Sequence, residues 1–578
     1  MTIQNFLKLS ACGFIIGISL HANDAKAQAV PAQLQPSQGI VDPARLDNQF
    51  NDETTIPDLG RSVEIQRAVI QGAPDNADEI MFELRNLSIE GVSAYGQEDL
   101  ASIYQDKLGT TVSLADIYAI ANRLTNKYRN EGYILTQVVV PPQTIDGGNV
   151  KLRVVEGFVD RVVVQGDNDP SALALIQKYA NNIGTGNALN IRDLEKNLLL
   201  INDLPGVTAR SVLSPSRTQA GASDLRIVVE RKEYDALLGI DNFGSRYLGP
   251  VQMTAAGSLN SMFGNNEQIT AQFVLSPFGN NDPELAYGAL SYEQPINSLG
   301  TTARAFFSHS NTEPGYDIDI FNVKGKSTTY GAGLEHPIIR SRTRNFKVRG
   351  QFDFRNVDSK SDIDVTREDR IRALRVGARY EFLDTLFGVG INALDAEVSQ
   401  GFDILGASDE GDAALTRPAG DPQFTKLNVA AQRLQRISSD VNLLLGFNGQ
   451  ISNKALLSSE EFGVGGINNG RGYDASEIIG EEGYSTKVEL QWKEPLESAF
   501  SGVEDYTVYS FWDFGKVWND DATISDNDES LSSVGIGVRA NLINNFEGGL
   551  MMAVPLTRDV QTMGDDDPRY YFNLSKRF

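Results

Sequence analysis

The chain has 578 residues, with 51 Lys and Arg against 76 Asp and Glu, which gives a formal net charge of −25. Such a charge opposes contact with phosphates, so we expect no nucleic-acid partner. No stretch of about 18 uncharged apolar residues occurs, which excludes transmembrane helices. One Cys and three His argue against a Cys/His metal site or a Cys/His catalytic dyad. We therefore expect no catalytic residues, no metal and no cofactor.

The first residues have the pattern of an export signal. An apolar run at 9–20 is too short to span a membrane, and the Ala-Lys-Ala sequence at 25–27 fits a small-residue cleavage site. Residues 1–27 are therefore predicted to be a signal peptide. The only cysteine, Cys12, lies inside it, and a mature chain without cysteine suits an exported protein that uses no disulfides. We expect export to the periplasm or outer membrane of a Gram-negative cell.

Three blocks precede the C-terminal part of the chain. Residues 28–80 are polar and carry five prolines, which predicts an N-terminal segment and linker with one candidate helix at 43–50. Residues 81–156 and 157–232 each show the order strand, helix, helix, strand, strand. In the first block the expected strands are 82–92, 133–140 and 149–156, and the expected helices are 97–108 and 113–130. In the second block the strands are 158–164, 207–214 and 224–231, and the helices are 171–183 and 192–203.

Residues 233–578 have a different pattern. About sixteen segments of roughly ten residues, of which 484–493 is a clear example, alternate apolar and polar side chains. Short turns, such as 543–545, interleave with long acidic connections, such as 400–423 and 453–482. A soluble β-sandwich would also alternate, but its connections need not differ in length. The pattern therefore favours an outer-membrane barrel with a polar lumen.

The last strand, 570–578, is aromatic on one face. Tyr570, Phe572, Leu574 and Phe578 all lie on that face, and the chain ends in phenylalanine. Such an ending is common in barrels that the outer-membrane assembly machinery inserts. We predict that these four residues form the barrel-assembly signal, and that the assembly machinery and outer-membrane lipid are partners of the chain.

Two short motifs lie in the barrel. Asn-Gly-Arg-Gly-Tyr at 469–473 is part of the connection 453–482, and Phe-Trp-Asp-Phe-Gly occupies 511–515 on the next strand but one. Each alone is a weak signal, because a loop arginine is usually just solvated. Together, in this order and after two α+β blocks, they are specific. The candidate functional residues are Arg471, Gly472, Tyr473, Phe511, Asp513 and Gly515.

Over the whole mature chain this organisation resembles the two-partner secretion transporters (TpsB type; haemolysin secretion/activation proteins such as ShlB, FhaC and HecB) of the superfamily that includes BamA. The resemblance implies α+β periplasmic POTRA domains at 81–156 and 157–232. An all-β transmembrane barrel of about 16 antiparallel strands at 233–578 would follow. It also implies that Arg471 folds back into the lumen and pairs with Asp513.

The resemblance has two further implications near the pore. The family usually has valine before the motif arginine; this chain has Gly470, which we expect to loosen the loop tip and to leave the charge pair intact. The family often begins with a helix that plugs the pore, and only 43–50 is a candidate here.

The resemblance implies transport and no enzymatic activity. The POTRA domains would recognise an unfolded exoprotein in the periplasm, a TpsA-type passenger such as a haemolysin or adhesin, by adding a strand to an exposed sheet edge. The barrel would then pass this chain to the cell surface. We expect a monomer in the outer membrane of a Gram-negative cell, with its POTRA domains in the periplasm.

Three other functions are open at this point. An outer-membrane assembly factor of the BamA or TamA kind would have the same architecture, although such proteins usually carry more than two POTRA domains. A barrel enzyme would need a nucleophile beside a base, and neither His309 nor His336 lies near a serine motif. A passive porin or siderophore channel would not need the two α+β blocks.

Overall fold

The computed structural model describes residues 38–50, 59, 72–166, 170–219, 221–277, 283–362, 366–495, 502–519 and 528–578. The signal peptide predicted at 1–27 lies outside the described residues, as does most of the linker between 51 and 71. Within the described ranges, no helix combines the length and the apolar character needed to cross a membrane.

The first α+β module packs one long helix on a small sheet. Its elements are β1 (Met81–Glu83), β2 (Asn86–Glu90), α3 (Gln97–Ala101), η3 (Gln105–Lys107), β3 (Thr111–Ser113), α4 (Leu114–Asn130), β4 (Gln137–Val139) and β5 (Asn149–Val155). Strand β5 is central in the order β2-β5-β4, parallel to β2 and antiparallel to β4. The stripe of α4 that helical spacing predicts, including Ile117, Ile120, Leu124 and Tyr128, is buried in the module's core. The Ser113 hydroxyl caps this helix by accepting a hydrogen bond from the Asp116 amide.

One expected strand of this module is divided. The segment 82–92 forms two strands, because the chain leaves one sheet and joins another within it. The amide of Leu84 donates to the Thr110 carbonyl at 3.0 Å, next to β3. The amide of Arg85 donates to the Gly148 carbonyl at 2.9 Å, next to β5. Consecutive residues therefore pair with different strands, which an alternating sequence pattern does not reveal.

Glu156, directly after β5, ties three segments of this module together. Its carboxylate accepts hydrogen bonds from the amides of Ser93 (2.9 Å) and Ala94 (3.0 Å) and from the Tyr128 hydroxyl (2.9 Å). Burial alone would raise the pKa of this carboxyl, but the hydrogen bonds outweigh it and lower the pKa below its usual value. Because the folded-state pKa is depressed, this stabilisation is present at neutral pH and is lost as the pH falls through that pKa.

Replacing Glu156 by glutamine is expected to lower the free energy of unfolding of this module by about 1–3 kcal/mol, because the neutral amide accepts weaker hydrogen bonds from these three donors than the carboxylate does. Hydrogen–deuterium exchange of α4 in the full chain at neutral pH measures the loss. Glu90→Gln is the control, since that carboxylate is 51% exposed beside Lys151, and it should change stability by less than about 0.5 kcal/mol. The gap between wild type and Glu156→Gln should close as the pH falls through the depressed pKa of Glu156, and a gap that stays constant would contradict the assignment.

The second module repeats the element order. It comprises β6 (Phe158–Gln165), α5 (Pro170–Asn181), α6 (Ile191–Asn202), β7 (Val207–Pro215) and β8 (Ala222–Arg231). Strand β8 is central in the order β6-β8-β7 and runs parallel to β6. Its core residues Leu225 and Ile227 pack with Ile176 of α5 and with Leu194 and Ile201 of α6. Both helices therefore cover the same face of the sheet.

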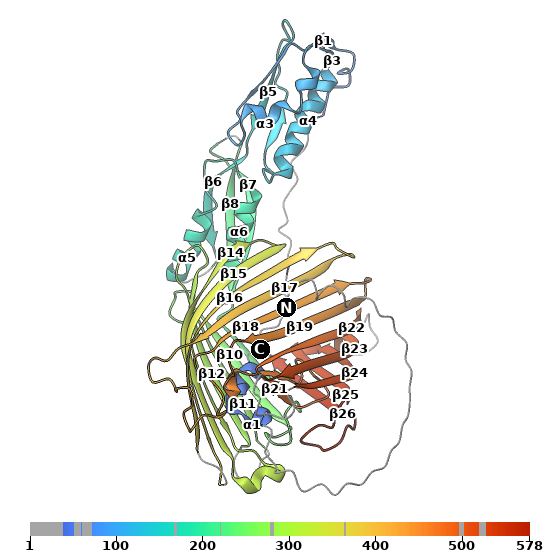
Figure 1. Cartoon of the computed structure of the whole chain (residues 1–578). Coiled ribbons are helices and arrows are strands. Elements are labelled where there is room, and N and C mark those ends of the chain that lie inside the picture. The colour runs from blue at the N-terminus through green and yellow to red at the C-terminus, as the bar shows by residue number, and fades with distance from the viewer. Residues whose placement is uncertain are drawn as a thin grey trace. The chain divides into compact units, whose positions relative to one another are not determined.

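The rest of the chain forms a closed antiparallel barrel (Figure 1). It has 16 strands, and the last strand, β26, pairs with the first, β9. The strands are β9 (Tyr234–Asp241), β10 (Gln252–Asn260), β11 (Gln268–Ser276), β12 (Leu285–Pro295), β13 (Thr302–Thr312), β14 (Lys324–Arg340), β15 (Arg344–Lys360), β16 (Arg367–Asp384), β17 (Gly390–Gly401), β18 (Thr425–Arg436), β19 (Val441–Ser452), β22 (Glu482–Pro495), β23 (Val503–Trp518), β24 (Asp528–Leu542), β25 (Phe546–Pro555) and β26 (Arg569–Arg577). The predicted fold class, an α+β region followed by a barrel of this size, is confirmed.

Connections and strand lengths follow a consistent pattern. Short turns such as η6 (Ile543–Asn545) alternate around the barrel with long connections such as 402–424. Several strands are longer than the roughly ten residues expected from the bilayer thickness, and β16 has 18 residues. They continue beyond that length because neighbouring strands go on pairing, as β15 and β16 do up to Ser359 and Arg367, beside the connection 361–366.

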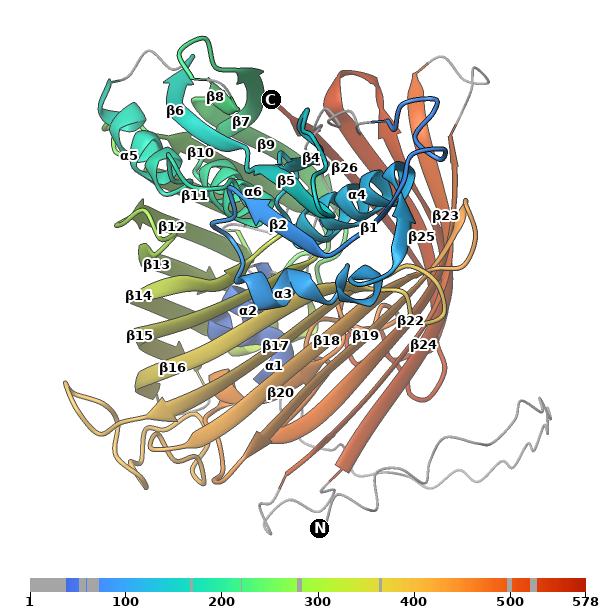
Figure 2. The same cartoon turned by 90° about the horizontal axis from the view of Figure 1, so that it is seen from above.

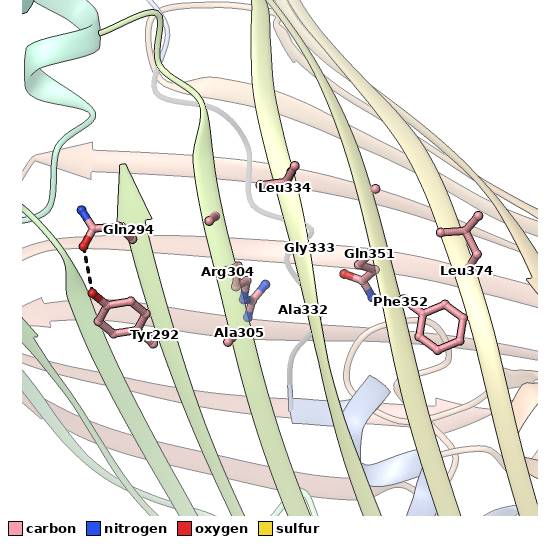
Figure 3. A pocket seen from close by; sticks show the side chains of 12 residues that line it. Tyr292, Gln294, Arg304, Ala305, Ala332, Gly333, Leu334, Gln351, Phe352 and Leu374 are labelled. Atoms are coloured by element: carbon pink, nitrogen blue, oxygen red, sulfur yellow. Dashed lines mark hydrogen bonds between the residues drawn. The ribbon is translucent and has the colours of Figure 1, made fainter. Parts of the chain in front are cut away.

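The outward face of the wall is apolar. Figure 3 shows a hollow there, where Ala305 and Ala332 lie between the larger Tyr292 and Phe352. The C-terminal aromatic face is exposed in the same way, with the following side-chain exposures: Tyr570 70%, Phe572 37%, Leu574 42% and Phe578 47%. These side chains are therefore available to lipid, and their role as an assembly signal stays a prediction.

Candidate functional site

A short helical segment packs on the inner face of the barrel. It consists of α1 (Gln38–Val41), η2 (Pro43–Arg45) and α2 (Leu46–Phe50), and Figure 2 shows α1 and α2 within the ring of strands. The hydroxyl of Ser310 on β13 donates to the Pro43 carbonyl, and that of Thr329 on β14 donates to the Asp47 carboxylate, both at 2.8 Å. Leu46 packs on inward-facing apolar side chains of β11 and β12, namely Val274, Leu285 and Tyr287.

The connection between β19 and β22 also folds into the lumen. This segment, 453–481, is called the inner loop below. It contains η5 (Ser458–Glu460) and a small hairpin of β20 (Phe462–Val464) with β21 (Ile478–Gly480). Val464 and Ile478 of the hairpin pack with Val517 of β23 and Leu531 of β24. The apolar side chains of this hairpin would be costly to expose to water, so their burial against the wall fixes the loop inside the barrel.

Arg471 and Asp513, which the sequence pairs by motif, are in contact. Nε and Nη2 of Arg471 donate to the two carboxylate oxygens of Asp513, each at 2.9 Å, and the Arg471 amide donates to the same carboxylate at 3.1 Å. The guanidinium carbon lies 3.6 Å from the centre of the Phe511 ring. Arg471 is 3% exposed and Asp513 is fully buried. A bidentate, desolvated pair stacked on an aromatic ring holds the loop tip in one position.

A second carboxylate, Glu489 of β22, completes the site and was not singled out from the sequence. It binds Nη1 of Arg471 and also accepts bonds from Arg539 of β24 at 2.9 and 3.2 Å. Arg539 in turn lies 3.8 Å from the centre of the Tyr509 ring. The only sequence signal for Glu489 is its inward position in the alternation of β22, shared with Lys487 and other polar residues. Two cations and two anions therefore form one chain across β22, β23 and β24.

The remaining motif residues fit the loop tip to the wall. The Tyr473 hydroxyl donates to the Ser532 carbonyl at 3.1 Å, and the ring is 1% exposed. A Cβ on Gly472 would lie 2.8 Å from the Cβ of Ser533, and a Cβ on Gly515 would lie 2.3 Å from a methyl carbon of Val464. Both glycines are thus required for close approach of loop and wall. The structure brings the motif residues Arg471, Gly472, Tyr473, Phe511, Asp513 and Gly515 together, and their role in transport is argued below.

Gly470 does not loosen the loop tip, contrary to the expectation from the sequence. It bridges to Gly466, and a Cβ at this position would lie 2.9 Å from the Cα of Gly465. The Tyr473 amide also donates to the Gly470 carbonyl at 2.9 Å. The tip is a tight turn in which glycine backbones are in contact. The missing side chain is therefore used for close packing and adds no freedom.

Gly470→Val is accordingly expected to destabilise the loop tip by about 1–3 kcal/mol, because the added methyl groups overlap the backbone of Gly465. Limited proteolysis of the inner loop in membranes measures the loss of order. Gly350→Val is the matched control, since a Cβ there meets open space. Equal protease resistance of both variants would contradict the packing argument.

The helical segment and the inner loop are joined through Arg45. Its guanidinium donates to the carbonyls of Ser458 (2.8 Å) and Glu461 (3.1 Å) and to the Ser476 hydroxyl (3.0 Å). The Ser458 hydroxyl donates back to the Asp42 carboxylate at 2.6 Å. The segment therefore lies between the strands β11–β14 and the inner loop, with polar contacts to both.

The two histidines considered for a barrel enzyme each share a hydrogen bond with a threonine, His309 with Thr328 and His336 with Thr301, both at 2.9 Å. Within the described ranges, no group of three or more His, Cys, Asp or Glu side chains could hold a metal ion. What the site can do is hold a loop and a helix inside a pore.

Comparison with known proteins agrees with this geometry. Residues 221–540, more than half of the chain, match the family described as haemolysin secretion/activation protein ShlB/FhaC/HecB. The chain belongs to this family. Residues 82–157 also match the POTRA domain of the ShlB type. As a member, the protein is an outer-membrane transporter of the two-partner secretion type with a periplasmic POTRA region, and a secreted exoprotein is its partner.

Individual relatives span nearly the whole chain. The heme/hemopexin transporter protein HuxB of Haemophilus influenzae (strain 86-028NP) is 24% identical over 563 residues, covering 93% of this chain and 95% of its own. The outer membrane transporter CdiB of Dickeya dadantii (strain 3937) is 22% identical, covering 84% and 86%. The names of these relatives describe transporters. The family is therefore one of transporters, which is as far as the comparisons test the expectation that the chain is no enzyme.

Solved structures show the same fold. CdiB from Escherichia coli superposes with a TM-score of 0.71 at 20% identity, covering 93% of this chain and 98% of its own. BamA from Haemophilus ducreyi lacking POTRA domains 1–3 reaches a TM-score of 0.51 at 11% identity, covering 86% and 100%. The family match, and the transporters among the relatives, support a secretion transporter over the assembly-factor alternative.

Proposed function

We propose that the barrel is the route by which an unfolded exoprotein crosses the outer membrane, and that the segment 38–50 and the inner loop close this route at rest. The observation that carries the proposal is the double polar attachment of Arg45 and Arg471 inside the barrel. Arg45 is 7% exposed and Arg471 is 3% exposed, so both groups are largely shielded from water. A path for a polypeptide exists only when at least one of these attachments opens.

Recognition would take place in the periplasm. Residues 157–232 have the element order of residues 81–156 and would form a second POTRA domain. Strands β2 and β4 of the first sheet, and β6 and β7 of the second, are sheet edges. An extended segment of the exoprotein can add to such an edge through backbone hydrogen bonds, which demand little of its sequence. We further propose that the transporter is a monomer and that its last strand is read by the assembly machinery.

The test is a comparison of cells with and without this chain. Loss of the chain should remove one large protein, or a small set, from the medium and cell surface, and should leave it in the periplasm or degraded. Expression of the wild-type chain should restore secretion. A general loss of barrel proteins from the outer membrane, with normal secretion, would support an assembly factor.

A further inference from the structure

We propose that Glu460 is a positioning residue for transport, and that it anchors the inner loop to a different arc of the wall from the one that holds the Arg471 site. The inference rests on the proposed function, in which the inner loop closes the pore. Glu460 is the last residue of η5 and is 1% exposed. Its carboxylate contacts three cations, Arg375 at 2.8 Å, Lys426 at 2.8 Å and Arg355 at 3.1 Å.

The three cations come from separate strands of the wall. Arg355 lies on β15, Arg375 on β16 and Lys426 on β18, whereas the Arg471 site lies on β22, β23 and β24. Backbone contacts add to the attachment, since Lys426 donates to the Glu460 carbonyl at 2.9 Å and Arg355 to the Ser459 carbonyl at 3.2 Å. The inner loop is thus tied at two places, about ten residues apart, to two different arcs of the barrel.

Charge balance explains why this attachment is strong. One further carboxylate, Asp353, binds Arg375 at 2.9 Å, so the cluster holds three cations against two anions. Arg375, Arg355 and Lys426 are each about one-tenth exposed. Without Glu460 three buried cations would face one anion, and a buried charge without a partner is unfavourable. The Glu460 carboxylate therefore stabilises the buried cations of the wall, and these cations in turn hold the loop in place.

The helical segment 38–50 contacts the inner loop directly beside Glu460. The two carbonyls that Arg45 binds belong to Ser458 and Glu461, on either side of the anchor. Arg45 therefore meets its acceptors only while Glu460 holds this stretch of the loop in place. Release of Glu460 from its cations is expected to loosen the loop and the segment 38–50 together.

The test measures pore opening by the full-length transporter in planar lipid bilayers. Glu460→Gln keeps the shape of the side chain and removes its charge, and it should raise the fraction of open time at least about tenfold. Glu410→Gln, an exposed carboxylate in the connection between β17 and β18, is the control and should leave the fraction of open time unchanged. Normal heat-modifiable migration of Glu460→Gln in electrophoresis would show that its barrel is intact.

A charge-balanced double variant separates anchoring from charge imbalance. Glu460→Gln with Lys426→Met returns the cluster to one excess cation, as in the wild type, but restores none of the contacts of Glu460, so this double variant should stay as open as Glu460→Gln alone. A double variant that closes like the wild type would assign the effect to charge imbalance, and either this result or a single variant that stays closed would overturn the proposal. If no exoprotein depends on the chain for secretion, the proposed function fails, whereas these conductance results would still report on the anchor.

Discussion

Removal of residues 38–50 is expected to open the barrel. The segment packs on inward-facing side chains of β11–β14 and meets the inner loop through Arg45, so its loss leaves a solvent-filled gap in the lumen. Purified protein lacking these residues should show a much larger ion conductance in planar bilayers than the wild type. Cells that carry it should become sensitive to large antibiotics that the outer membrane normally excludes.

Arg45→Ala should give a smaller effect in the same direction. The variant leaves the carbonyls of Ser458 and Glu461 without their donor, at a cost of about 1–3 kcal/mol each, but it keeps the apolar contacts of Leu46. Arg85→Ala, which changes a 66% exposed arginine of the first module, is the matched control. Wild-type conductance after deletion of 38–50 would show that the inner loop alone closes the pore.

The barrel could be predicted from the sequence because its determinants are local and repeated. Each strand alternates, and a run such as 484–493 already shows which side chains face the lumen. The buried face of α4 could be predicted in the same way, because Ile117 and Leu124 recur at helical spacing. The division of 82–92 between two sheets was missed, because both halves alternate and only pairing with Thr110 and Gly148 separates them.

The candidate site could be predicted only where a motif marks it. Arg471 and Asp513 belong to the two motifs at 469–473 and 511–515. Glu489 and Glu460 belong to no motif, and their sequence context does not distinguish them from other polar residues of a strand or loop. Their importance comes from cations that reach them across the lumen from other strands, and strand tilt and register decide which side chains meet. The contacts of Arg45 join positions more than 400 residues apart in the chain. No local pattern encodes such contacts.

Arg471→Ala is expected to reduce secretion by at least about tenfold while the barrel stays inserted and heat-modifiable, because the variant leaves Asp513 buried without its cation. Asp513→Ala should also reduce secretion strongly, but less than Arg471→Ala, because Arg471 keeps Glu489 as a partner. Arg471→Lys should be milder still, because lysine keeps the positive charge. It should still reduce secretion, since an ammonium group cannot reproduce the two parallel bonds to Asp513. Secretion is measured as exoprotein in the medium relative to transporter in the outer membrane.

The double variant decides whether these residues act as a pair. In the double variant Arg471→Ala with Asp513→Ala, no buried carboxylate is left unpaired at position 513. Secretion should therefore be no worse than with Arg471→Ala alone. Arg539→Ala is the matched control, since it deletes a neighbouring lumen arginine and leaves the contact between Arg471 and Asp513 intact. It should cost less than either single variant of the pair. If the losses of the two single variants simply add in the double variant, Arg471 and Asp513 act independently, and the loop tip is held by its apolar hairpin and Tyr473 alone.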